Sequence, residues 1–77
     1  MTHQRPAKRS LTLRGHRTSV TLEDIFWKTF CNIAAEDHKT INGLAAEIDA
    51  NRGDIGLASA IRIHVLERCL ARIQSFE

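Results

Sequence analysis

The stretch SLTLRGHRTSVTLEDIFW, residues 10–27, decides how this chain begins to fold. Leu11 and Leu13 alternate with polar residues before Gly15, and Val20 and Leu22 do so after it. Alternation at period two is typical of a strand with one buried face. The apolar positions are odd before the glycine and even after it, so one straight strand would divide them between two faces. We therefore predict two short strands, residues 10–13 and 17–22.

A bulge or turn at residues 14–16 would correct the change of parity, and Gly15 is its natural position. The two strands then form either a hairpin or a kinked ribbon. A single uninterrupted strand in each chain cannot make a sheet, so we expect another element to complete the ribbon.

Three amphipathic helices are predicted after the strands. The first begins at about Glu23, and its aromatic and aliphatic residues recur at helical spacing. Thr40 is an expected N-cap for the second helix, and the segment NRGDIG, residues 51–56, is a loop. The third helix runs roughly over residues 57–75. Its apolar surface is broader than two short helices require: Leu57, Ala60, Ile61, Ile63, Val65, Leu66, Cys69, Leu70 and Ile73.

The length of 77 residues allows one domain of marginal stability, since a chain this short buries only about 60% of its unfolded surface. Two cysteines, Cys31 and Cys69, do not indicate a disulfide framework, and we interpret both as buried free thiols. No apolar run has the length of a signal peptide or membrane span, which favours a cytoplasmic protein without a membrane partner. Oligomerisation is then the expected source of additional stability.

Positive charge is concentrated at the N-terminus. Residues 1–22 carry five Lys/Arg and no acid, whereas residues 23–77 carry six Lys/Arg against nine Asp/Glu. A basic segment on a mildly acidic body indicates a polyanionic partner. We assign residues 1–9 to a basic flexible arm and residues 10–77 to the folded domain.

Residue patterns that carry catalysis or bind metals are missing. The four histidines, at positions 3, 16, 38 and 64, form no metal-ligand spacing with one another or with a cysteine. No glycine-rich phosphate loop and no Ser/His/Asp or Cys/His arrangement is recognisable, and the chain is small for a substrate pocket. We expect neither an enzyme nor a metal or other cofactor.

The segment RTSVTLEDIFWKTFCNIAAED, with GLASAIRIHVLERCL further along, resembles the ribbon-helix-helix DNA-binding domains of the Arc and methionine repressor class. The resemblance covers about residues 10–72. Within the family, this part of the chain is similar to a subgroup of small bacterial proteins. It implies a mainly α fold with a short N-terminal β-ribbon, in which two chains intertwine as a homodimer. In that dimer, the strand at residues 17–22 would pair with its copy from the second chain.

The resemblance also implies a DNA site. A two-stranded ribbon fits the major groove of double-stranded DNA. Arg17, Ser19 and Thr21 would face outward toward base edges, with Arg14 beside them. Lys8 and Arg9 of the arm would neutralise phosphates.

The chain departs from the family pattern at two points. Thr18 occupies an inward position where the family usually places an aliphatic residue, so that end of the ribbon is expected to fray. The family has two helices after its strand and this chain has three. TINGLAAEID, residues 40–49, is either the second family helix, which makes Thr40 to Asn42 a phosphate anchor, or an added helix, which moves the anchor to Ala58 and Ser59.

We favour the added helix. Thr40 and Asn42 are nevertheless included among the predicted DNA-binding residues. The leading hypothesis is a homodimeric regulator of transcription. The rival is a dimeric protein-interaction module, an adaptor or antitoxin-like partner that uses the same fold without reading DNA bases.

Overall fold

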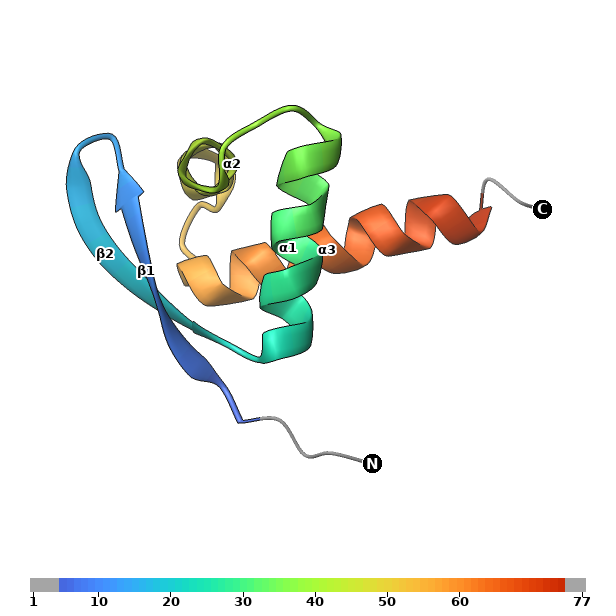
Figure 1. Ribbon diagram of the computed structural model, residues 1–77, viewed down its shortest axis with the longest axis horizontal. Coiled ribbons are helices and arrows are strands. Elements are labelled where there is room, and N and C mark those ends of the chain that lie inside the picture. The colour runs from blue at the N-terminus through green and yellow to red at the C-terminus, as the bar shows by residue number, and fades with distance from the viewer. Residues whose placement is uncertain (1–4, 75–77) are drawn as a thin grey trace.

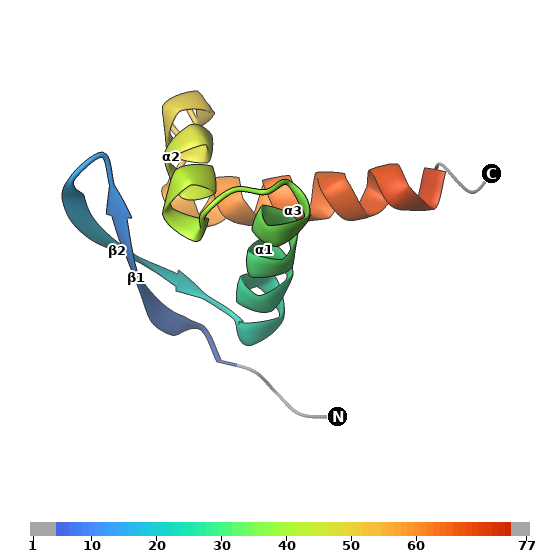
Figure 2. The same cartoon turned by 45° about the horizontal axis from the view of Figure 1, so that its top comes forward.

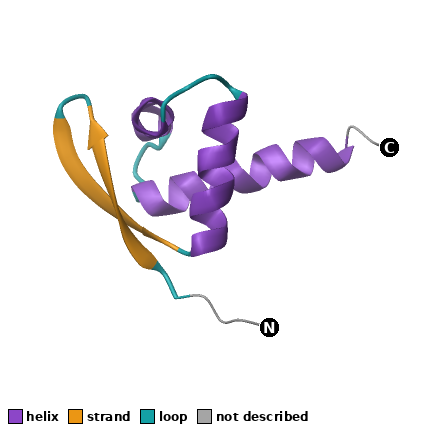
Figure 3. Ribbon diagram, viewed as in Figure 1, coloured by secondary structure: helices purple, strands orange, loops and turns teal. Residues whose placement is uncertain are grey.

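The computed structural model describes residues 5–74 and contains two strands followed by three helices. Strand β1 (Ala7–Leu13) and strand β2 (His16–Leu22) form an antiparallel hairpin, which lies at one end of the molecule (Figure 1). Helices α1 (Asp24–Glu36), α2 (Ile41–Asn51) and α3 (Leu57–Gln74) follow in chain order. The helices gather against one face of the hairpin, and its other face is left open (Figure 3).

The hairpin decides between the two arrangements that the sequence left open for the strands. β2 pairs with β1 of the same chain in a two-stranded antiparallel sheet, so the strands form a hairpin and not a kinked ribbon. β1 also begins at Ala7, so Lys8 and Arg9 belong to a strand and not to a flexible arm. Residues 1–4 of the predicted arm lie outside the described residues. Thr18 pairs with Leu11, and β2 continues beyond it to His16, so the expected fraying at this position is wrong.

A two-residue turn, Arg14 and Gly15, explains the parity change in the sequence. It pairs Leu13 with His16, and all later pairs follow from this register. Residues that face each other across an antiparallel pair point to the same side of the sheet. Leu11, Leu13, Val20 and Leu22 therefore share one face, and all four are buried.

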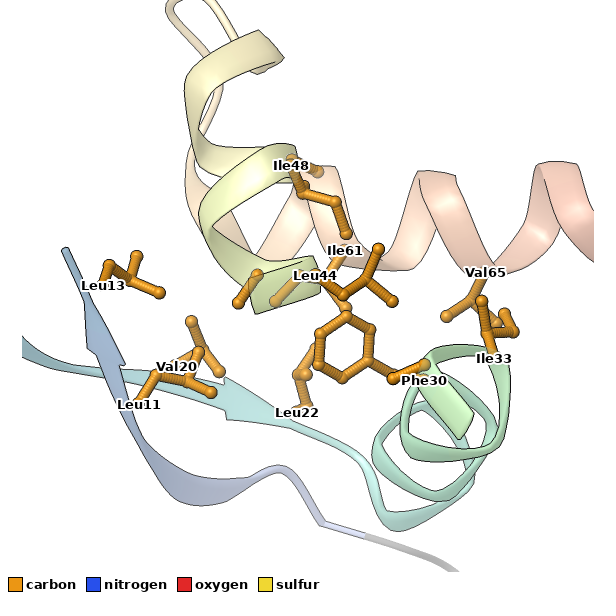
Figure 4. Close-up of a cluster of buried hydrophobic side chains, with 13 residues drawn as sticks. Leu11, Leu13, Val20, Leu22, Phe30, Ile33, Leu44, Ile48, Ile61 and Val65 are labelled. Atoms are coloured by element: carbon orange, nitrogen blue, oxygen red, sulfur yellow. The ribbon is translucent and has the colours of Figure 1, made fainter. Parts of the chain in front are cut away.

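The helices supply the rest of a single core beneath that face (Figure 4). Phe30 is 0% exposed and is the largest of the fully buried side chains. It belongs to one cluster of buried residues to which every element contributes, as the apolar spacings predicted: Leu11, Leu13, Val20, Leu22, Ile33, Ala34, Leu44, Ala45, Ile48, Ala60, Ile61 and Val65. α1 begins after Glu23, and Thr40 is the N-cap of α2, where its hydroxyl accepts a hydrogen bond from the Gly43 N–H at 2.9 Å.

The prediction that both cysteines are buried free thiols is confirmed only in part. Cys31 and Cys69 are free thiols, but both are half-buried rather than buried. Burial raises the pKa of the Cys31 thiol. Among residues 5–74, no three His, Cys, Asp or Glu side chains gather as a metal site would require. In the same range, no helix has the length and apolar character needed to cross a membrane.

Two arginines hold the junction between β2 and α1. From β1, Arg9 lies 3.4 Å from an Asp24 carboxylate oxygen and 5.6 Å from the centre of the Trp27 ring. From α3, Arg62 donates to a Glu23 carboxylate oxygen at 2.8 Å. Arg62 also lies 3.3 Å from the Thr21 carbonyl oxygen. The hairpin is thus tied by charge both to the start of α1 and to α3.

We expect Phe30→Ala to lower the free energy of unfolding by about 3–5 kcal/mol, because it leaves a cavity where strands and helices meet. Ile25→Ala is the matched control on the same helix. Ile25 is 62% exposed, so its truncation should change stability by less than about 0.5 kcal/mol. Urea unfolding followed by circular dichroism measures both. Equal losses for the two variants would contradict the placement of α1.

Acid should destabilise this fold through its paired carboxylates. A hydrogen bond from its own backbone N–H, and then one from Arg62, lower the pKa of Glu23 from its ordinary 4.5. A hydrogen bond from Arg68 lowers the pKa of Asp37 from its ordinary 3.8. The unfolded chain therefore binds more protons near pH 4, so stability is full above that range and falls as pH drops through the folded pKa values.

Glu23→Gln should reduce the difference in thermal midpoint between pH 7 and pH 3. Arg62→Gln should remove a smaller part of the same difference, because the backbone hydrogen bond to Glu23 remains. Midpoint differences identical to that of the parent for both variants would show that this pair does not contribute to the acid response.

Candidate nucleic-acid interface

The face of the hairpin that turns away from the helices is entirely polar. Its cross-strand pairs are Thr12 with Arg17, Ser10 with Ser19 and Lys8 with Thr21, and all six side chains are exposed. The structure thus brings Arg17, Ser19 and Thr21 together on one outward face. Sequence reasoning missed that β1 doubles this face with Lys8, Ser10 and Thr12. The signal was the alternation of the segment AKRSLTL, which continues back from Leu13 to Ala7.

The turn places a third cation at the tip of the hairpin. Arg14 has φ 51° and Gly15 has φ 83°. Two positive φ values define the turn that best matches the twist of a two-residue hairpin, and Asn-Gly is its favoured sequence. An arginine in the left-handed region costs about 1–2 kcal/mol, because its Cβ approaches the following carbonyl oxygen. A strained backbone at an exposed arginine indicates that the side chain has a function.

The ion pairs of the chain divide its cations into two sets. All six Lys/Arg after residue 22 pair with carboxylates: Lys28, Lys39, Arg52, Arg62, Arg68 and Arg72. Within the described residues, the cations that form no ion pair are Arg5, Lys8, Arg14 and Arg17. These four lie in or just before the hairpin, and residues 5–22 contain no acid. The uncompensated positive charge of the fold is therefore concentrated on the hairpin.

Arg9 does not belong to this exposed set, which corrects its predicted contact with phosphates. Its side chain is 20% exposed and lies on the inward side of β1, opposite Val20. A hydrogen bond from Lys28, with the nearby charge of Arg9, lowers the pKa of Asp24. Arg9 is engaged by Asp24 and Trp27 of its own chain, so its side chain is not available to phosphates.

The N-terminus of α2 lies against the edge of β1. The Thr12 N–H donates to the Asn42 side-chain oxygen at 3.0 Å, which ties the first turn of α2 to the hairpin. Thr40 and Asn42 are both exposed there, and the hydroxyl of Thr40 satisfies the Gly43 N–H. The structure thus brings Asn42 to the edge of β1, with Thr40 as the N-cap at the start of the same helix. The alternative anchor residues differ from each other: Ser59 is exposed in the first turn of α3, whereas Ala58 packs against the core.

Comparison with protein families identifies the fold. The model of a family described as the ribbon-helix-helix domain matches residues 6–69. The match includes the hairpin, α1, α2 and α3 as far as residue 69, so each of the three helices lies wholly or mostly within it. Neither the search of curated proteins nor the search of solved structures found a match. Because the family match covers most of the chain and its elements occur in the expected order, the chain belongs to the ribbon-helix-helix family.

Proposed function

We propose that this protein binds double-stranded DNA as a homodimer and regulates transcription, with the outer face of the hairpin placed in the major groove. The observation that carries the proposal is the division of the cations in the described part of the chain. Those of the helices pair with carboxylates, whereas the four that form no ion pair lie in or just before the hairpin: Arg5, Lys8, Arg14 and Arg17. Membership of a family whose domains typically bind DNA supports it.

The chemistry of the outer face suits base reading. A two-stranded ribbon has dimensions that enter the major groove. Arg17 can make two parallel hydrogen bonds to a guanine, while hydroxyls such as those of Ser19 and Thr21 accept several bases. Ser10 and Thr12 extend the same chemistry onto β1. Lys8, at the far end of the hairpin from the turn, is suited to a phosphate contact because its ammonium group is a point charge.

The start of α2 suits a phosphate that borders the groove. A helix N-terminus presents backbone N–H groups and a partial positive charge to an anion. Asn42 uses its side-chain oxygen on Thr12, which leaves its amide N–H groups available as donors. Contact between this turn and the hairpin favours Thr40 and Asn42 as the anchor over Ala58 and Ser59.

We expect Arg17→Ala to weaken binding to a preferred site by about 1–3 kcal/mol and to relax the preference at one base pair. Lys8→Ala should weaken binding to all DNA sequences alike, because it removes a phosphate contact. It should also reduce the slope of log binding constant against log salt concentration by about one unit. Arg72→Ala is the control, because it removes one positive charge at the end of α3 that is distant from the hairpin. It should change neither the affinity for DNA nor its salt dependence.

Fluorescence anisotropy on a selected site and on a random duplex, in matched salt, measures these three effects. Equal losses on both duplexes for Arg17→Ala and Lys8→Ala would reduce the hairpin to an electrostatic patch. A parent protein that binds no DNA at low salt would overturn the proposal in favour of a protein-interaction module.

Arg14 offers a test in which stability and binding should move in opposite directions. Arg14→Asn relieves the left-handed strain, because asparagine adopts positive φ more readily, and should raise the free energy of unfolding by about 1 kcal/mol. It should also weaken DNA binding, since the tip loses a cation. Thermal unfolding and anisotropy on the same sample report the two effects. A more stable variant with unchanged DNA affinity would exclude Arg14 from the interface.

A further inference from the structure

A cavity of about 280 Å³ lies between α2 and α3, beside the end of α1. Figure 2 shows α2 crossing the first turns of α3 at this place. Leu44 and Ile48 of α2 and Ala60 of α3 line the cavity, and all three are buried. Clefts that bind small molecules are mostly apolar with a few polar groups, and they measure about 300–1,000 Å³. The cavity is near the lower limit of this range, so it suits a small molecule.

Both cations that line the cavity are already paired within the chain. Lys39 donates to a Glu47 carboxylate oxygen at 2.9 Å. Arg52 donates to an Asp49 carboxylate oxygen at 2.7 Å and to the Ile55 carbonyl oxygen at 2.6 Å. An anionic ligand would compete with these internal partners for the two cations. The cavity is therefore not prepared for an anion.

Three groups that can accept hydrogen bonds are left free at the cavity. Glu67 forms no ion pair within residues 5–74, a property that it shares there only with Asp54 among the carboxylates. Asn51 donates its side-chain N–H to the Glu47 carbonyl oxygen at 2.9 Å, which leaves its own side-chain oxygen available. The Nε2 atom of His64 is buried without a hydrogen-bond partner, and a neutral imidazole can accept a hydrogen bond there.

The electrostatic surroundings of these groups favour a positive charge. Glu67 lies three residues after His64, so both side chains occupy the same side of α3. α2 ends at Asn51 with no basic residue in its last turn, and the carbonyl groups at a helix C-terminus carry a partial negative charge. A bare metal ion is not favoured, because no three His, Cys, Asp or Glu side chains of residues 5–74 gather as its ligands.

We propose that the cavity between α2 and α3 binds a small organic cation, an ammonium compound with an apolar body. An ammonium group has three N–H donors and no acceptor, which matches the free acceptors of Glu67, His64 and Asn51. The apolar body would lie against Leu44 and Ile48. Hydrogen bonds between charged groups are about twice as strong as those between neutral groups, so the head group should decide between ligands of one size.

A titration followed by nuclear magnetic resonance tests the site without DNA, because the proposal is independent of the proposed function. The full chain, labelled with nitrogen-15, is titrated with hexylammonium, hexanol or hexanoate, which share one six-carbon chain. Hexylammonium should shift the amide signals of the cavity residues of α2 and α3 and reach saturation. Hexanol and hexanoate should bind at least about tenfold more weakly. Absence of saturation, shifts confined to other elements, or equal affinity for hexanol would overturn the proposal.

Two matched variants test the role of the unpaired carboxylate. Glu67→Gln should weaken hexylammonium binding at least about fivefold and leave the weak binding of hexanol unchanged, because only the cation loses its charged partner. Asp54→Asn is the control: it removes the same charge from the other carboxylate without an ion pair, which does not line the cavity. Both side chains are exposed, so the thermal midpoint should stay close to that of the parent. Unchanged affinity in Glu67→Gln, or equal losses in the two variants, would overturn the site.

Discussion

The two-residue turn at Arg14 and Gly15 is the constraint on which the rest of the structure depends. It sets the register that opposes Leu13 to His16, and this register gathers four apolar residues on the inner face. A slip of one residue would turn the apolar side chains of one strand toward solvent and its polar side chains toward the core. The same register therefore creates the buried face that holds the helices and the polar face that we propose for DNA.

Arginine has two roles in this chain, and neighbouring carboxylates decide between them. Arg9 and Arg62 approach the junction of β2 and α1 from opposite elements and meet Asp24 and Glu23 there. Arg17 is only eight residues from Arg9, yet it forms no ion pair with any acid of residues 5–74. Alternation along the strands separates the structural cations from the free ones, and with no acid before Glu23 the outer face stays positive.

α3 is apolar on two of its sides. One side contributes Ala60, Ile61 and Val65 to the core beneath the hairpin, and the other carries exposed apolar residues: Ile63, Leu66, Leu70 and Ile73. A chain of this size has little core to spare, so a helix that is apolar on both sides is an economical way to gain stability from a second copy.

The sequence by itself determined the elements and their inner faces. Period-two alternation, the glycine at the parity change, the Thr40 cap and the helical apolar spacings are local signals, and each predicted its element because short-range geometry sets it. The strand that completes the ribbon was decided only by the tertiary structure, since a bulge and a turn satisfy the same parity change. The role of Arg9 was likewise undetermined, because its partners Asp24 and Trp27 are fifteen and eighteen residues away. The chain determines which side chains can be buried, but the charges left free depend on which distant segments the fold brings together.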